Sequence, residues 1–110
     1  MDALVNATVI ITGAASGIGK GAALAVARRG SNVVVADIDD AGSATTVSQI
    51  KDLGANAVAV HTDVADVSAF EELREAALRS YGSVDVVMNN AGVLTRGAPE
   101  DIDGSSKLRV

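Results

Sequence analysis

The chain has 110 residues, a length that suits one small domain. It carries a net charge of −5, and 48% of its residues are hydrophobic although only 2% are aromatic. Because there is no cysteine, disulfides, thiolate metal sites and cysteine nucleophiles are excluded. The acidic balance and the lack of a basic cluster argue against nucleic acid as a partner, and no apolar run reaches the roughly 18 residues that cross a membrane.

Strand-like and helix-like patterns alternate in the first half of the chain. The apolar run Ala7–Ile11 predicts a buried strand, and the alanine-rich segment Gly17–Arg29 predicts a helix that Gly30 ends. The β-branched run Asn32–Asp37 is typical of a second strand that is buried on both faces.

The alternation continues with a second helix and a third strand. Asp39 or Asp40 is placed to cap a helix that reaches Leu53, and Gly54 is its stop signal. The next apolar run, Ala57–His61, predicts the third strand.

A third helix and a fourth strand complete the series. Ser68 and Glu71 have the spacing of a capping box and start a helix to about Ser80, with Gly82 after it. The run Ser83–Met88 predicts strand four. This order predicts an α/β fold: a Rossmann-type, doubly wound parallel sheet with four strands in the order 3-2-1-4 and three helices.

The most informative segment is the glycine turn, Thr12–Gly19, which joins the first strand to the first helix. A helix N-terminus presents unpaired N–H groups and a positive dipole end, and glycines let a phosphate approach the backbone and permit unusual φ and ψ angles. A P-loop is excluded, because Ala14 stands where its first glycine belongs and Gly21 where its hydroxyl residue belongs. A tight connection without a ligand is the alternative reading of the turn alone.

Two motifs resemble those of the short-chain dehydrogenase/reductase family. The spacing of Gly13, Gly17 and Gly19 is similar to its cofactor motif T-G-x-x-x-G-x-G, and Asn89–Gly92 is similar to its motif N-N-A-G. The resemblance extends from Met1 to about Pro99. It implies an NAD(P)-dependent oxidoreductase that transfers hydride between a nicotinamide cofactor and an alcohol or carbonyl substrate, represented here by its N-terminal cofactor-binding portion.

In the predicted strand order, the chain reverses direction between strands one and four. Ligands of open α/β sheets bind in the crevice at this point, beyond the carboxyl ends of the strands. Both motifs border that crevice. The residues expected to bind the cofactor are Gly13, Ser16, Gly17, Ile18, Gly19, Asp37, Asp63, Val64, Asn90, Ala91 and Gly92.

Asp37 predicts which dinucleotide is bound. It ends strand two, 18 positions beyond Gly19, where a carboxylate accepts hydrogen bonds from the adenosine ribose and repels a 2′-phosphate. No arginine adjoins it, so NAD(H) is expected over NADP(H). The alternative is that Asp37 helps to cap the following helix, a role that Asp39 or Asp40 could fill instead.

The other polar residues take their expected roles from the family resemblance. It implies that Asp63 and the backbone N–H of Val64 recognise adenine, although a loop aspartate that favours a turn is the alternative for Asp63. It also implies that Asn90 stabilises the loop and the central strand, and that the backbone of Ala91 and Gly92 approaches the cofactor ribose. Asn89 is open to a purely structural role.

No catalytic residue can be assigned in this chain. Members of the family use a Tyr-x-x-x-Lys pair and an upstream serine, but the only tyrosine is Tyr81 and the residue four positions later is Asp85. His61, the only histidine, has no catalytic partner that the sequence reveals, and we interpret it as a strand or pocket-rim residue. No metal site is predicted.

The organisation along the chain predicts an incomplete enzyme. Residues 1–97 are expected to form the NAD(P)-binding Rossmann portion, and residues 98–110 a polar, flexible tail. Since full members of the family have about 250 residues, the chain is interpreted as truncated and catalytically incomplete, with its substrate bound only in a full-length form. A short gene product, a variant transcript, a disrupted gene and a cloning boundary all remain open.

Two alternatives to an oxidoreductase remain open: a non-catalytic nucleotide-binding module and a non-functional truncated product. Strand four would have an open edge, which predicts marginal stability or self-association. The N-terminus lacks the basic flank and long apolar stretch of a signal peptide, and the location is expected to be cytoplasmic.

Overall fold

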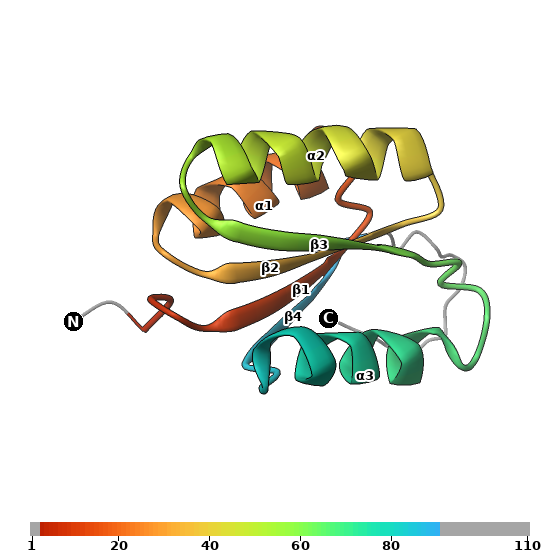
Figure 1. Cartoon of the computed structure of the whole chain (residues 1–110). Helices are drawn as coiled ribbons and strands as arrows, with labels where there is room; N and C mark the ends of the chain where they lie inside the picture. The colour runs from red at the N-terminus through yellow and green to blue at the C-terminus, as the bar shows by residue number, and fades with distance from the viewer. Residues whose placement is uncertain (1–2, 91–110) are drawn as a thin grey trace.

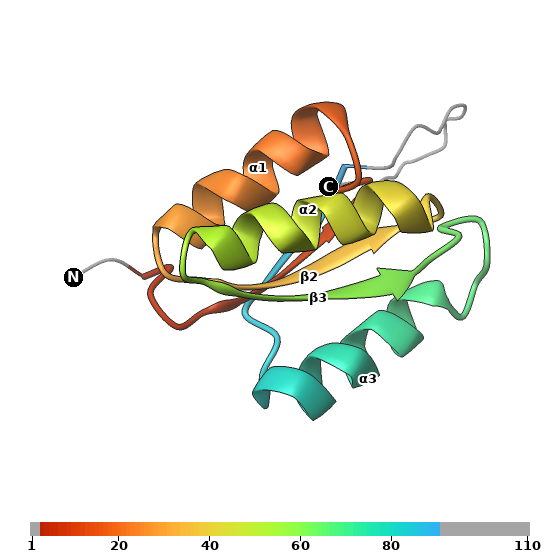
Figure 2. The same cartoon turned by 45° about the horizontal axis from the view of Figure 1, so that its top comes forward.

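The computed structural model describes residues 3–90, which form a parallel sheet covered by helices on both faces (Figure 1). The elements are β1 (Thr8–Thr12), α1 (Gly17–Arg28), β2 (Asn32–Asp37), α2 (Asp40–Asp52), β3 (Asn56–His61), α3 (Ala69–Tyr81) and β4 (Val86–Asn89). Helices α1 and α2 lie on one face of the sheet and α3 on the other, as both views show (Figure 2).

The strand order is β3-β2-β1-β4, and all three pairings are parallel. At the centre of the sheet, Ile10 of β1 is in register with Val34 of β2 and with Val87 of β4. The order reverses between β1 and β4, as the sequence predicts. The Rossmann-type fold is therefore confirmed.

The core consists of two apolar layers, one on each face of the sheet. Val9 and Val35 belong to the layer under α1 and α2, which Ile50 of α2 completes. Ile10 belongs to the layer under α3, which packs on it through Leu73. Because β1 and β2 are buried on both faces, their sequences are continuous apolar runs instead of alternating ones.

Strand four begins at Val86, three residues later than predicted. The carboxylate of Asp85 accepts hydrogen bonds from the backbone N–H of Thr8 at 2.8 Å and from the hydroxyl of Ser83 at 3.0 Å. The N–H of Thr8 thus donates to a side-chain carboxylate instead of to a backbone carbonyl of a neighbouring strand. The residues from Ser83 to Asp85 connect α3 to β4 and fasten the start of β1, and the strand ladder begins after them.

The predicted capping box of α3 is wrong. Ser68 is the N-cap residue, but its side chain makes no capping hydrogen bond and its hydroxyl donates to Oδ1 of Asp66 at 2.8 Å. The same carboxylate accepts from the backbone N–H of Ser68 at 3.0 Å, and this bond holds the pKa of Asp66 below its usual value. The helix therefore starts from a turn organised by Asp66.

The helices end as the sequence predicts. Gly30, Gly54 and Gly82, which follow α1, α2 and α3, all have positive φ angles. Within residues 3–90, none of the helices has the length and hydropathy needed to cross a membrane.

Candidate functional site

A pocket of about 210 Å³ opens beyond the carboxyl ends of β1, β2 and β3, the end of the sheet where ligands of this architecture bind. It is lined by Gly13, Ala36, Asp37, Ile38, Thr62, Asp63 and Val64. The structure thus brings together four residues that the sequence predicts for the cofactor: Gly13, Asp37, Asp63 and Val64. We refer to it as the strand-end pocket.

Asp37 stands between this pocket and the glycine turn. Its Oδ2 accepts from the backbone N–H of Ala15 and its Oδ1 from that of Asp39, both at 3.0 Å. A carboxylate has about four acceptor sites, so capacity remains for ribose hydroxyls. The helix-capping role belongs to Asp39, whose Oδ1 accepts from the N–H of Gly42 at 3.0 Å. Contact of Asp37 with a ribose remains a prediction.

The start of α1 is open to an anion. Its N-cap residue, Ser16, makes no side-chain capping hydrogen bond, and the first turn has no acidic residue. Ser16, Gly17 and Ile18 are all exposed, Ile18 to 83%. By contrast, α2 is capped by its own Asp39. The N–H groups at the start of α1 could hold an anion, because a helix N-terminus attracts negative charge.

The glycines of the turn serve different purposes. Gly13 and Gly17 have φ angles of +67° and +59°, which side chains rarely tolerate. Gly19 has no such angle, but a Cβ there would overlap the carbonyl oxygen of Gly13 and lie 2.7 Å from Nδ2 of Asn90. Gly19 therefore lets α1 pack closely against the end of β1, a role distinct from phosphate approach.

Asn89, the last residue of β4, and Asn90, directly after it, join that strand to the end of β1. Oδ1 of Asn89 accepts from the hydroxyl of Thr12 at 2.9 Å, so Asn89 has a structural partner. Nδ2 of Asn90 donates to the carbonyl of Gly13 at 3.5 Å, which places Asn90 beside the glycine turn. Ala91 and Gly92 lie outside the described residues.

The wall of the pocket that follows β3 is shaped by Asp63. Oδ1 of Asp63 accepts from the backbone N–H of Ala65 at 3.0 Å, so this residue also forms a turn, as the alternative interpretation expects. Its recognition of adenine remains a prediction. Ile38, 60% exposed, and Thr62 also line the pocket but are not predicted from the sequence. The sequence feature that could have identified them is their position directly after β2 and β3.

Neither His61 nor Tyr81 lines the strand-end pocket. Nδ1 of His61 lies 2.8 Å from Oδ1 of Asp40, a partner that the sequence did not reveal, and both side chains are largely exposed. Tyr81 ends α3, where burial raises the pKa of its phenol, whereas an acid/base tyrosine needs a lower pKa. No group of three or more His, Cys, Asp or Glu residues in the described part could hold a metal ion.

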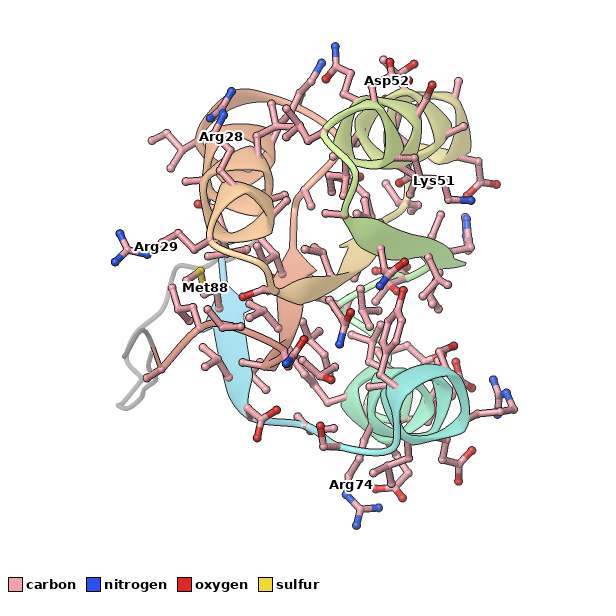
Figure 3. The ribbon with its side chains drawn as sticks, turned by 60° about the vertical axis from the view of Figure 1, so that its left-hand side comes forward. Arg28, Arg29, Lys51, Asp52, Arg74 and Met88 are labelled. Atoms are coloured by element: carbon pink, nitrogen blue, oxygen red, sulfur yellow. The ribbon has the colours of Figure 1, made fainter. Side chains whose placement is uncertain are left out.

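Two basic residues at the C-terminal end of α1 are outside the pocket lining. Arg28 and Arg29 lie at the C-terminal end of the helix, and their side chains extend outward from it (Figure 3). A cation at this end interacts favourably with the helix dipole.

Comparison with known proteins places the chain among dehydrogenases. The model of the short chain dehydrogenase family matches residues 7–107. L-rhamnose 1-dehydrogenase (NAD(P)(+)) of Azotobacter vinelandii is 44% identical over 94 residues, which are 82% of this chain and 37% of that protein. Diacetyl reductase [(S)-acetoin forming] of Staphylococcus epidermidis is 45% identical over 86 residues, 78% of this chain and 34% of that one.

Solved structures agree with this grouping. A hydroxysteroid dehydrogenase from Escherichia coli superimposes with a TM-score of 0.77 at 38% identity, over 81% of this chain and 38% of that chain. A short chain dehydrogenase/reductase from Burkholderia phymatum in complex with NAD gives a TM-score of 0.75 at 34% identity, over 79% of this chain and 31% of that chain. The chain thus spans well under half the length of the proteins it matches.

Proposed function

The chain belongs to the short-chain dehydrogenase family, and from this premise we propose that it is the NAD(H)-binding portion of an oxidoreductase acting on an alcohol or carbonyl substrate. The observation that carries the proposal is the position of Asp37, whose carboxylate lines the strand-end pocket and also bonds to the glycine turn. Asp37 thus borders both the strand-end pocket, where we propose that the nucleoside binds, and the glycine turn, where we propose that the phosphates bind.

The proposed binding mode assigns each part of the dinucleotide to a different segment. The N–H groups at Ser16–Gly19 hold the pyrophosphate, because the start of α1 is uncapped. The carboxylate of Asp37 accepts from the adenosine ribose, and adenine lies against Asp63 and Val64. Asn90, which bonds to the carbonyl of Gly13, borders the cofactor beyond the turn. When bound, the nicotinamide ring gives or accepts the hydride.

The charges around the pocket support NAD(H) over NADP(H). Asp37 and Asp63 line the strand-end pocket, which has no lysine or arginine in its lining. Asp39 and Asp40 follow at the start of α2. A 2′-phosphate at this ribose would face carboxylates with no lysine or arginine in the described lining, and the repulsion between like charges disfavours it.

Titration of the chain with NADH and with NADPH tests the proposal. We expect NADH to bind at least about 5-fold more tightly, since one fixed carboxylate facing a phosphate costs on the order of 1 kcal/mol or more. Fluorescence or calorimetry measures both affinities. Tighter binding of NADPH would contradict the cofactor preference. Binding of neither would favour the non-functional product.

We further propose that these 110 residues bind the cofactor without transferring hydride. Their only tyrosine, Tyr81, lies at the end of α3, on the face of the sheet opposite to α1 (Figure 1). Its raised pKa disfavours proton transfer near neutral pH. The catalytic groups and the substrate-binding residues would then belong to a full-length form. An assay of NAD-dependent alcohol oxidation, in which full-length members of the family are active, tests this proposal. We expect no turnover, and measurable turnover would contradict it.

The edge of β4 predicts self-association of the chain. Within residues 3–90, β4 pairs only with β1, it has no charged residue, and Val87 is 47% exposed. Such an edge favours pairing with another strand. Sedimentation velocity should therefore show oligomers that increase with concentration, and Val87→Lys should reduce them. Val67→Lys, at a fully exposed position before α3, is the matched control and should have no effect. A concentration-independent monomer would contradict this prediction.

A further inference from the structure

The glycine turn has an exposed half and a buried half. Ser16 and Gly17 face solvent, whereas Ala14 and Ala15 are 0% and 6% exposed. The exposed half is the part proposed to bind phosphate. Its position depends on what holds the buried half, because the two are consecutive in the chain.

The buried half is held by α2. The hydroxyl of Thr46 donates to the carbonyl of Ala14 at 3.0 Å, a contact that is shielded from solvent and joins residues 32 positions apart. The Thr46 side chain is fully buried. Its hydroxyl is also within 3.2 Å of the carbonyl of Gly42 in its own helix, so one proton is shared between the helix and the turn.

A second residue on the same side of α2 packs on the next residue of the turn. A Cβ at Gly42 would lie 2.8 Å from the Cβ of Ala15 and 2.6 Å from Oδ2 of Asp39, so the backbone of the helix comes unusually close to the turn. Positions 42 and 46 are neighbours on one face of a helix. This face of α2 therefore contacts Ala15 and Ala14 in succession.

We propose that Thr46 is a positioning residue for the dinucleotide, an inference that rests on the proposed function. It touches no part of the cofactor. Its hydroxyl fixes the carbonyl of Ala14, and the carboxylate of Asp37 fixes the N–H of Ala15. These two bonds hold the strand end and the start of α1 at the spacing that the ribose and the pyrophosphate require. The backbone N–H groups of Gly13 and Ala14 also donate to the buried carbonyl of Ala36, at 2.8 and 3.4 Å. Without the hydroxyl, the turn keeps these bonds to β2 but loses its side-chain anchor to α2, so the N–H groups of α1 are held less firmly.

The chain contains a matched control for this hydroxyl. Ser43 lies three residues earlier in α2 and is 2% exposed, but its Oγ has no hydrogen-bond partner. Ser43→Ala therefore removes a buried hydroxyl from the same helix without removing a contact to the turn. Thr46→Val removes the hydroxyl with little change in volume, and Thr46→Ser keeps it.

The binding experiment compares these three variants with the unaltered chain. We expect Thr46→Val to weaken NADH binding about 3- to 10-fold, the effect of losing one neutral hydrogen bond, while Thr46→Ser and Ser43→Ala bind as the unaltered chain does. Urea unfolding run in parallel shows that each variant is folded. Unchanged affinity in Thr46→Val, or equal losses in the valine and serine variants, would overturn the inference.

Hydrogen exchange without cofactor gives a second readout. In Thr46→Val, the amide of Ala15 should exchange about 10-fold faster, while the amide of Val34 in the core of β2 exchanges at its original rate. Unchanged exchange at Ala15 would overturn the positioning role. Failure of the unaltered chain to bind NADH would contradict the proposed function instead, so the two failures are distinguishable.

Discussion

Replacing Asp37 with asparagine is expected to weaken NADH binding by about 10- to 100-fold, the range for a hydrogen bond to a charged group, and to remove the preference over NADPH. Both carboxylate oxygens already accept backbone N–H groups, at Ala15 and at Asp39. An asparagine side chain has only one acceptor atom, so it cannot keep both bonds. It also removes the charge that repels a 2′-phosphate. Titration with both cofactors measures the two effects together.

The control for this variant is Asp39→Asn. Asparagine caps helices as well as aspartate does, so the bond to the N–H of Gly42 survives while a nearby charge is lost. We expect this variant to keep most of the preference for NADH. Should Asp37→Asn and Asp39→Asn change the ratio of affinities equally, a diffuse acidic field and not Asp37 would set the preference.

Replacing Gly19 with alanine is expected to destabilise the fold by about 1–3 kcal/mol, a typical cost of overpacking, and to abolish measurable cofactor binding. The added Cβ would overlap the Gly13 carbonyl oxygen, a backbone atom that cannot rotate away. Relief of this overlap requires α1 to move from the end of β1, which would also displace the N–H groups proposed to hold phosphate. Urea unfolding measures the stability, and titration with NADH measures the binding.

Gly21→Ala is the matched control, one half-turn further along the same helix. A Cβ at Gly21 would meet no atom within 4 Å, and the position is exposed. Alanine favours a helix more than glycine does, so this variant should stabilise the chain by about 0.5–1 kcal/mol. If both glycine variants shifted the urea midpoint in the same direction, the close packing at Gly19 would not be the cause.

The sequence predicts this fold well because its signals are local and periodic. The apolar runs of β1 and β2 and the glycines after the helices are visible without a structure, and their order determines the topology. The boundary of β4 was predicted wrongly, because Asp85 replaces a main-chain partner with a side chain. The capping box of α3 failed for a similar reason, since Asp66 competes for the hydroxyl of Ser68. Residue spacing does not indicate which of several nearby groups will accept a given hydrogen bond.

Some residues of the candidate site could be predicted from the sequence and others could not. Gly13, Asp37 and Asp63 could be predicted because each lies at the end of a strand or just after it, and strand ends meet at one edge of a parallel sheet. Thr46 could not be predicted, because a threonine in a polar helix has no pattern that marks its partner 32 residues away. The partnership of Asp40 with His61 also arises only when α2 docks beside β3.

The contact between Thr46 and Ala14 has a consequence for synthesis of the protein. A ribosome makes the glycine turn first, but the residue that anchors its buried half follows 32 positions later. At the usual rates of translation this interval is roughly 2 to 6 s, during which the nascent turn exists without its anchor. The glycine turn therefore gains this contact only after α2 has emerged and docked, and Asp63 and Asn90 of the proposed site are made later still.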